Sequence, residues 1–253
     1  MSLRLTRTIC AAVALLACVP GVAAAAETGA ALNKTEIERI VRDYILANPE
    51  IITEAIGILQ QRQEDEQAMA AAAALAANQD ELFNSPTSPV IGNPRGDVTL
   101  VEFFDYNCGY CKAAHPQRKA AVADDGKVRV VMKEFPILSA SSLEAAKGAL
   151  AAAKQGKYEE MHEILITWQG PLSAAAVREA AAKVGLDLKR LEADMESPET
   201  LAEIEANRAL ARQLGINGTP GFVIGETVVP GMIGREAFTA LFESERAAGK
   251  AAN

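Results

Sequence analysis

The feature that most limits the folds open to this chain is a β-prone run that leads into two closely spaced cysteines. Residues 98–104 form a continuous, mostly apolar stretch, as found in strands buried on both faces. Cys108 and Cys111 follow it, where a helix-prone segment over 109–124 begins. We therefore expect a strand that gives way to a helix, with both thiols on the first helical turn.

That placement favours redox chemistry. A helix N-terminus presents unpaired backbone N–H groups and the positive end of the helix dipole, which stabilise a thiolate and lower its pKa. We expect Cys108 to attack a substrate disulfide as the nucleophile, and Cys111, one turn later, to resolve the mixed disulfide. Gly109 and Tyr110 lie between the two cysteines, so we expect them to tune the pKa and the shape of the surface there.

The first 26 residues have the layout of a secretory signal peptide. Arg4 and Arg7 precede a short apolar run, and a series of small residues closes the segment. We therefore predict release after Ala26 and export to the periplasm. The alternative is a lipoprotein, because Cys18 follows a Leu-Leu-Ala sequence that resembles a lipidation site.

Cysteine usage favours redox work over structural cross-linking. Of the four cysteines, Cys10 and Cys18 lie in the predicted leader, which leaves only the 108/111 pair in the mature chain. Small exported domains that are stapled by disulfides carry several widely spaced pairs instead. A single close pair in an exported protein therefore indicates a reactive dithiol.

The mature chain is acidic. Without Arg4 and Arg7, 23 of the 25 basic residues remain against 33 acidic ones, a formal charge of −10. No basic stripe is present that could neutralise phosphates, so nucleic acid is excluded as an expected partner.

Around the cysteine pair, the pattern predicts an α/β fold with a helical insertion. A second strand is expected at 127–135, and a short hairpin followed by a closing helix at 221–247. We place this domain at 97–253 and the insertion at about 139–199. Apolar residues recur at helical spacing through this part, with helices expected at 141–155, 157–168, 173–184, 187–194 and 198–214.

Two further helices are expected ahead of this domain. One spans 35–47, where Thr35 and Glu38 form a candidate capping box, and a long one runs from Pro49 to about Phe83. Both carry apolar residues at helical spacing near their beginnings, which a solitary arm would leave exposed.

We therefore divide the N-terminal part into an arm at 27–84, which is expected to form oligomers, and a Pro/Gly-rich linker at 85–96. A solvated arm that makes no contact with other copies is the alternative.

Residues 90–246 resemble the thioredoxin superfamily, and within it the DsbA-like proteins. The resemblance depends on the strand–Cys-x-x-Cys–helix unit, the helical insertion, and Thr219-Pro220 ahead of a short apolar segment. It implies a thioredoxin fold in which Pro220 is a cis-proline beside the cysteine pair. It also implies that the backbone of Thr219 is offered to the substrate peptide.

The arm, together with the Cys-Gly-Tyr-Cys sequence, resembles the suppressor-of-copper-sensitivity C (ScsC) and Com1-like proteins. This resemblance implies a homotrimer that isomerises or reduces disulfides in misfolded or copper-oxidised exported proteins. It further implies a membrane-bound thiol reductase as the partner that keeps the site reduced. Gly109 and Tyr110 replace the histidine that the best-known DsbA enzymes have between their cysteines, so strong oxidant behaviour is not implied.

Alternatives remain open at this point. A monomeric DsbA-type dithiol oxidase is one, and a copper-handling or binding protein with Cu(I) at Cys108 and Cys111 is another. A zinc site would add His115, but it lacks a fourth ligand because His162 is distant in the sequence. No cofactor is expected. Glu102, in the strand before the motif, is either a buried acid that moves a proton to or from Cys111 or a partly exposed structural carboxylate.

Overall fold

The computed structural model of the protein describes residues 33–251. The predicted signal peptide and the alternative lipidation site at Cys18 lie outside the described residues. The chain divides into two compact units, one up to Gly57 and one from Ile58 onward, and each is described by itself.

The first unit contains helix α1 (Lys34–Ala47) and the beginning of α2 (Glu50–Ala77). The capping box at the start of α1 is formed by Asn33 and Glu36 rather than by the predicted pair Thr35 and Glu38. The Glu36 N–H donates to Oδ1 of Asn33 at 3.0 Å, and the Asn33 N–H donates to Oε2 of Glu36 at 3.1 Å. Asn33 takes the cap because it lies directly before the first helical residue. No residue of α1 is buried.

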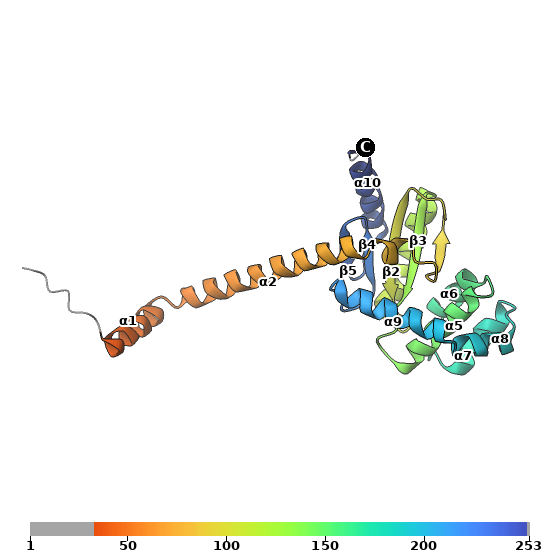
Figure 1. Ribbon diagram of the computed structural model, residues 1–253, viewed down its shortest axis with the longest axis horizontal. Coiled ribbons are helices and arrows are strands. Elements are labelled where there is room, and N and C mark those ends of the chain that lie inside the picture. Colours follow the sequence, from red (N-terminus) through yellow and green to blue (C-terminus); the bar gives the residue numbers. More distant parts are fainter. Residues whose placement is uncertain (1–32, 252–253) are drawn as a thin grey trace, which may run out of the picture. The chain divides into compact units, whose positions relative to one another are not determined.

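The second unit is built on one five-stranded sheet (Figure 1). Its strands are β1 (Val90–Gly92), β2 (Val98–Phe104), β3 (Val128–Glu134), β4 (Gly221–Ile224) and β5 (Thr227–Pro230), in the order β1-β3-β2-β4-β5. Strands β2 and β3 are parallel, and the other neighbouring pairs are antiparallel. The parallel pair is joined through helix α4 (Gly109–Asp125), as a βαβ unit requires.

Strand β2 is buried on both faces because its side chains alternate between two apolar clusters. Leu100 and Phe104 pack in the cluster that includes residues of α4 and α10 (Arg235–Ala251). Val101 and Phe103 pack in a second cluster with residues of α9 (Pro198–Gln213), Leu75 and Leu82. Helices therefore cover both faces of the sheet.

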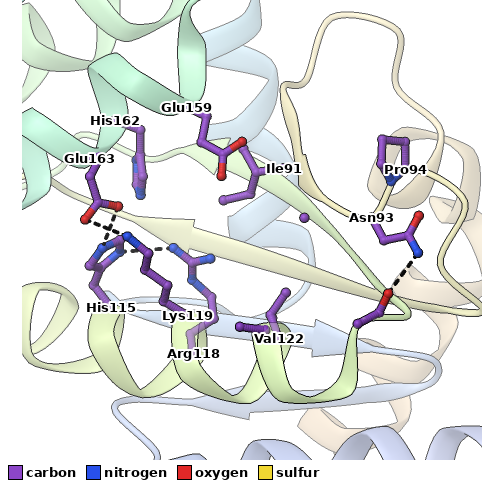
Figure 2. A pocket seen from close by; sticks show the side chains of 13 residues that line it. Ile91, Asn93, Pro94, His115, Arg118, Lys119, Val122, Glu159, His162 and Glu163 are labelled. Carbon is purple, nitrogen blue, oxygen red and sulfur yellow. Dashed lines mark hydrogen bonds and ion pairs between the residues drawn. The ribbon is translucent and has the colours of Figure 1, made fainter.

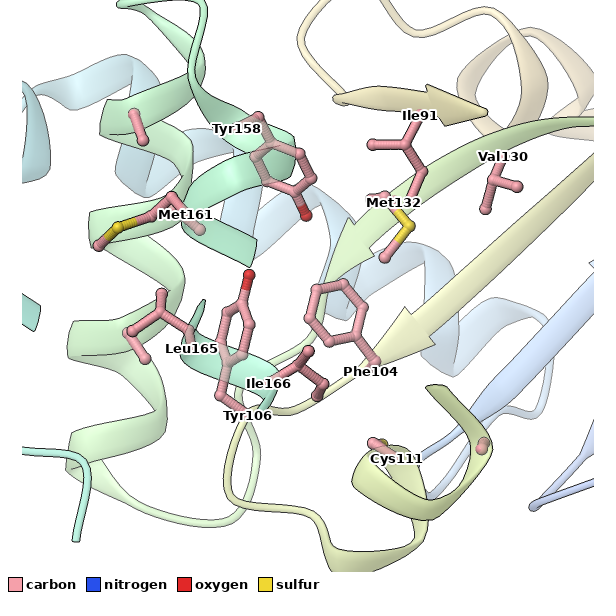
Figure 3. Packing of buried hydrophobic residues seen from close by; sticks show 14 of the residues in the cluster. Ile91, Phe104, Tyr106, Cys111, Val130, Met132, Tyr158, Met161, Leu165 and Ile166 are labelled. Atoms are coloured by element: carbon pink, nitrogen blue, oxygen red, sulfur yellow. The ribbon is translucent and has the colours of Figure 1, made fainter. Parts of the chain in front are cut away.

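The helical insertion packs against the end of the sheet that carries the cysteine motif. It consists of α5 (Ala140–Ala153), α6 (Tyr158–Ile166), α7 (Ala174–Lys183) and α8 (Leu188–Met195), and α9 follows it in the chain. Figure 3 shows α6 side chains, including Tyr158 and Leu165, facing Phe104 and Tyr106 of the sheet side. The predicted helices are confirmed, with small shifts at their ends.

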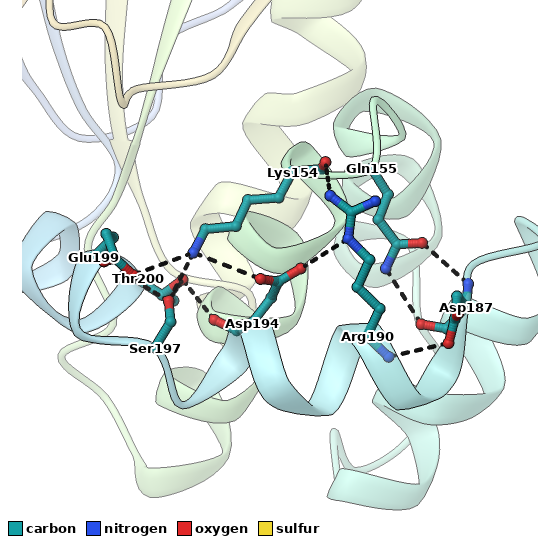
Figure 4. Close-up of polar contacts among 8 residues, drawn as sticks. All are labelled: Lys154, Gln155, Asp187, Arg190, Asp194, Ser197, Glu199 and Thr200. Atoms are coloured by element: carbon teal, nitrogen blue, oxygen red, sulfur yellow. Dashed lines mark hydrogen bonds and ion pairs between the residues drawn. The ribbon is translucent and has the colours of Figure 1, made fainter.

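Polar contacts join α8 and α9 to the end of α5 (Figure 4). The Lys154 ammonium donates to Oγ of Ser197 at 2.7 Å, and the Arg190 guanidinium donates to the Lys154 carbonyl at 2.8 Å. The Asp187 N–H donates to Oε1 of Gln155 at 3.0 Å. The capping residues Asp187 and Ser197 thus lie beside α5 as well as starting their own helices.

The long predicted helix from Pro49 to Phe83 is interrupted at Asn78, which separates α2 from the short helix α3 (Gln79–Phe83). The Asn78 side chain donates to the Ala74 carbonyl at 2.7 Å and so satisfies a carbonyl at the end of α2. None of the helices within residues 33–251 combines the length and the apolar character needed to cross a membrane.

The structure also differs from the sequence analysis in the region predicted as arm and linker. Leu75 and Leu82, from the predicted arm, are buried in the core of the second unit. Within the predicted linker, β1 pairs with β3, and the Ser88 hydroxyl donates to Oε1 of Glu203 at 2.7 Å. The lysine of β3, Lys133, is fully buried and donates to Oγ of Ser88 at 2.7 Å. Residues 75–92 are therefore structural parts of the second unit.

Gly148 in α5 allows a close helix contact and gives a first prediction. A Cβ added there would lie 2.5 Å from Cγ1 of Val177 in α7. Alanine is the better helix former by about 1 kcal/mol, but overpacking a core costs about 1–3 kcal/mol. We expect Gly148→Ala to lower the free energy of unfolding, as measured by urea denaturation. Gly57→Ala is the control because an added Cβ meets no atom within 4 Å there; equal stability of both variants would contradict the contact.

Candidate active site

The Cys108 side chain is the N-cap of helix α4. Its backbone is extended (φ −74°, ψ 115°), and the Cys111 N–H donates to its Sγ at 3.3 Å. An N-cap acceptor is normally an oxygen that satisfies one of the free N–H groups in the first turn. Sulfur takes that role here, so the helix N-terminus is directed at the thiol, where it stabilises negative charge.

The fold brings the four predicted site residues Cys108, Cys111, Thr219 and Pro220 together. Both cysteines are free thiols, and Cys111 is fully buried. When it is protonated, the Cys108 thiol donates to the carbonyl oxygen of Thr219, with 3.2 Å between Sγ and that oxygen, and the Thr219–Pro220 peptide bond is cis. The Gly231 N–H donates to the Pro220 carbonyl at 2.8 Å and ties this loop to the end of β5. The loop 218–221 is therefore positioned against the sulfur by the sheet itself.

The two thiols have very different acidities. The hydrogen bond from the Cys111 thiol is the main reason why the pKa of Cys108 falls to about 6; burial opposes the shift, and Thr219 and the Cys111 and Tyr110 backbones add to it. The hydrogen bond with Cys108 and burial together raise the pKa of Cys111 far above its usual range. At neutral pH, Cys108 is therefore the thiolate and Cys111 the thiol.

The two residues between the cysteines lie at the surface. Tyr110 is 70% exposed, and a Cβ added at Gly109 would meet no atom within 4 Å. The Tyr110 backbone contributes to the low pKa of Cys108 through its hydrogen-bonding group. Tuning by the Tyr110 side chain and by Gly109 stays a prediction.

The loop before the motif is held by Asp105 and Asn107, which the sequence analysis did not single out. Oδ1 of Asp105 accepts from the Asn107 N–H at 2.7 Å, and Oδ2 accepts from the Ile137 and Leu138 N–H groups at 2.9 and 3.0 Å. The Asn107 amide donates to the Oγ of Ser139 at 3.0 Å, and it also reaches two further serines at the start of α5. The position of Cys108 thus depends on residues at the beginning of the insertion. In the sequence, an Asp directly after a predicted strand and a cluster of serines at 139–142 were the features that could have indicated these contacts.

Glu102 is buried and forms an ion pair with Arg118 of α4, with 2.6 Å between Oε2 and Nε. Burial raises the pKa of Glu102, and the Arg118 charge opposes that shift. The carboxylate is close enough to the cysteine pair to contribute to the raised pKa of Cys111. Glu102 is therefore buried rather than partly exposed, and it pairs with Arg118, which the sequence analysis had missed; the transfer of a proton between Glu102 and Cys111 stays a prediction.

A second polar network lies between the motif and α6. The hydroxyls of Tyr106 and Tyr158 donate to Oε1 of Glu134 at 3.0 and 2.9 Å. The Tyr106 oxygen also lies 3.1 Å from Nδ1 of His162. Burial raises the pKa of Glu134 well above its usual range and lowers that of His162, so the imidazole is neutral. This network fixes Tyr106, which precedes the nucleophile by two residues.

A cavity of about 520 Å³ is lined by His162 of this network and by His115, and the cysteines do not line it (Figure 2). His115 lies there, with Nε2 3.1 Å from Oε2 of Glu163 and Nδ1 3.1 Å from Nη2 of Arg118. The zinc ligand set considered from the sequence is therefore not assembled, because His115 is held by Glu163 and Arg118. Among residues 33–251, no group of three or more His, Cys, Asp or Glu side chains is arranged to hold a metal ion.

The acidity of Cys108 gives the second prediction. The rate of Cys108 alkylation by iodoacetamide should follow an ionisation near pH 6, since only the thiolate reacts. Cys111→Ala removes the main stabilising hydrogen bond, so we expect the midpoint to move to higher pH. Cys111→Ser is the matched control because its hydroxyl can still donate, and its midpoint should move less. A midpoint that is the same in all three proteins would contradict the assignment to Cys111.

Two families match the chain. The thioredoxin family matches residues 84–244, and the N-terminal domain of the copper resistance protein ScsC matches residues 33–66. The first match contains Cys108, Cys111, Thr219 and Pro220. The second covers α1 and the beginning of α2.

Solved structures agree with these matches. A thioredoxin-like oxidoreductase from Silicibacter pomeroyi DSS-3 is 46% identical, with a TM-score of 0.66 over 67% of this chain and 98% of that one. ScsC of Proteus mirabilis in a transitional conformation is 32% identical, with a TM-score of 0.66 over 86% and 100% of the two chains. The thiol-disulfide exchange protein alpha-DsbA2 from Wolbachia pipientis is 27% identical, with a TM-score of 0.65 over 71% and 97%.

Among curated proteins, the chain is similar to the Na(+)/H(+) antiporter NhaA of Herminiimonas arsenicoxydans, at 31% identity over 172 residues and 65% of this chain. It spans about a quarter (27%) of that protein's length. Three observations indicate the same family. They are the family match over residues 84–244, the order of the strands in the sheet, and the cysteine pair beside a cis-proline loop. The chain belongs to the thioredoxin family, as an oxidoreductase-like member that is similar to the ScsC and DsbA-like proteins.

Proposed function

We propose that this thioredoxin-like oxidoreductase is a periplasmic disulfide isomerase and reductase that acts on misfolded or copper-oxidised exported proteins. The observation that carries the proposal is the division of acidity within the pair. Cys108 has a pKa of about 6 and is the thiolate, while Cys111 is buried and keeps its proton. In such a pair, the thiolate can attack a substrate disulfide at neutral pH, while the second thiol stays protonated until it resolves the mixed disulfide.

The proposed reaction starts when the Cys108 thiolate attacks one sulfur of a substrate disulfide. A Cys108–substrate disulfide forms, the substrate S–S bond breaks, and the departing substrate thiolate takes a proton from water. In isomerisation, a different substrate thiolate then attacks the mixed disulfide and releases Cys108 unchanged. No net electrons pass between enzyme and substrate in that cycle.

In reduction, Cys111 loses its proton and attacks Sγ of Cys108. A Cys108–Cys111 disulfide forms, the second substrate thiol leaves, and the enzyme dithiol has given two electrons to the substrate. Glu102 is a buried carboxylate whose charge acts on Cys111. We therefore propose that Glu102 accepts the proton that Cys111 loses. The proposed partner that returns the disulfide to the dithiol is a membrane-bound thiol reductase.

Self-association is proposed because α1 and the first part of α2 expose an apolar surface that has no cover. α1 has no buried residue, and its Ile40 and Tyr44 are among the exposed large apolar side chains. Such a surface marks a protein contact, and several copies would also raise the local concentration of active sites around one substrate. We propose a homotrimer, in keeping with the ScsC N-terminal match at 33–66. The exposed apolar residues of this surface within the first unit are Ile37, Ile40, Val41, Tyr44, Leu46, Ile52 and Ile56.

The proposed periplasmic location depends on the leader at 1–26, with lipidation at Cys18 as the alternative. Among similar structures is one described as a periplasmic thioredoxin-like protein from Salmonella enterica serovar Typhimurium, 31% identical over 67% of this chain.

The third prediction concerns isomerisation. The reduced mature chain should restore activity to a protein whose disulfides have been scrambled, and Cys108→Ser should abolish the recovery. Cys111→Ser is the informative control: it should keep isomerisation, which needs only Cys108, and lose net reduction of a substrate disulfide.

Other outcomes of that experiment decide between the alternatives. A monomer that oxidises a reduced peptide but restores nothing would be a DsbA-type dithiol oxidase. Cu(I) binding that needs both Cys108 and Cys111, without thiol exchange on any polypeptide, would indicate a copper-handling protein.

The fourth prediction concerns the arm. Removing residues 27–57 should leave a folded monomer, because the second unit begins at Ile58 and keeps Leu75 and Leu82 in its core. We expect the shortened protein to keep the low pKa of Cys108 and to lose most of its isomerase activity. Light scattering gives the mass, and an unchanged oligomer would contradict the assignment of self-association to 27–57.

A further inference from the structure

A groove of about 730 Å³ lies between the cis-proline loop and the middle of α2, within the second unit. One wall includes Thr219, Pro220 and residues 212–218 after α9, with Val228 and Pro230 of β5. The opposite wall consists of Glu64, Gln67, Ala68, Ala70 and Ala71 of α2.

The α2 wall is a single helical stripe. Its residues 64, 67, 68 and 71 have the i, i+3, i+4, i+7 spacing that places side chains on one face. Ala70 lies beside them, so three of the five α2 residues that line the groove are alanines, whose small side chains leave space in it. Each residue of a helix is turned by about 100° from the one before it, so Ala73 lies on the side of α2 opposite to Glu64. It does not line the groove.

The groove reaches the loop that contacts the reactive sulfur. Thr219 lines it, and the Thr219 carbonyl lies 3.2 Å from Sγ of Cys108. A substrate cysteine that is bonded to Cys108 therefore lies beside this loop, and the residues next to it in the substrate extend along the loop. β5 is the outermost strand on this side of the sheet, so no further strand closes the groove there.

The charges of the groove suit a polypeptide that reaches both walls. Glu64 lines it from α2 and Arg212 from the end of α9. Within residues 33–251, the side chains of Glu64 and Arg212 form no ion pair or hydrogen bond with the rest of the protein. Both charges are thus available to an extended chain of mixed charge. Cys108 itself does not line the groove, so a small disulfide can react there without entering it.

We propose that residues 64–71 of α2 form the far wall of the substrate cleft, so that an unfolded polypeptide bonded to Cys108 is held between α2 and the cis-proline loop. This inference deepens the proposed function and depends on it. It assigns a substrate-selecting role to α2, separate from the self-association proposed for residues 27–57.

The test compares Ala68→Trp with Ala73→Trp in the full mature chain. Ala68 is exposed, so tryptophan there fills the groove without entering the core. Single-turnover reactions of the reduced proteins would be measured with cystamine and with an unfolded polypeptide that contains mispaired disulfides. We expect Ala68→Trp to lower the rate constant for the polypeptide by about tenfold or more, since shape changes in a binding site have effects of that size. The cystamine rate should stay unchanged.

The outcomes separate this inference from the function on which it depends. Equal polypeptide rates for Ala68→Trp and Ala73→Trp, with normal cystamine rates, would overturn the α2 wall and leave the oxidoreductase intact. A parent protein that reacts with neither substrate would overturn both. Equal losses on cystamine and on the polypeptide would show damage to the thiol site and would also count against the wall.

A second measurement does not depend on rates. Cys111→Ser should trap a mixed disulfide with a peptide whose single cysteine is activated as a thionitrobenzoate disulfide: the Cys108 thiolate attacks the peptide sulfur, thionitrobenzoate leaves, and no resolving thiol remains. Ala68→p-benzoylphenylalanine in that complex should cross-link to the peptide on illumination, whereas Ala73→p-benzoylphenylalanine should not. Cross-links of equal yield from both positions, or from neither, would contradict the proposal.

Discussion

The chemistry of this protein depends on one hydrogen-bonding relation, in which the sulfur of Cys108 takes the place of an N-cap oxygen at α4. The Cys111 N–H points at that sulfur, and the Cys111 thiol provides the largest stabilisation of its thiolate. The same contact raises the pKa of Cys111, so one geometric relation makes one thiol reactive and the other inert. Strand β2, buried on both faces, fixes where the helix begins, and the cis-proline loop closes the site from the other side.

Much of the fold followed from local sequence patterns. The helical spacing in 141–214 and the apolar run at 98–104 predicted the elements that the structure contains. β1 was missed because a three-residue strand inside a Pro/Gly-rich stretch has no periodicity to detect. The end of α2 was misplaced because Asn78 stops the helix with its own side chain, in a sequence that otherwise favours helix throughout.

The site could be predicted in part. Cys108 and Cys111 are only three positions apart, so their redox chemistry could be predicted from the sequence pattern itself. The roles of Thr219 and Pro220 could be predicted only from a family resemblance. The pairing of Glu102 with Arg118 and of Glu134 with Tyr106 and Tyr158 joins elements that are distant along the chain. Such contacts depend on how β2, β3, α4 and α6 pack, which no local pattern specifies. The groove wall on α2 is hidden for the same reason, since alanines in a helix indicate only helix formation.

The attachment of the motif loop to the insertion has a consequence for the evolution and engineering of this fold. The Asn107 amide reaches serines at the first turn of α5, and Asp105 receives two N–H groups from the segment just before it. A shortened chain in which the sheet is joined across 139–199 would lose the serines and leave Asn107 unsupported. The insertion is therefore not a detachable module: grafting the Cys-Gly-Tyr-Cys sequence onto a minimal scaffold would transfer the sulfurs without the framework that orients them.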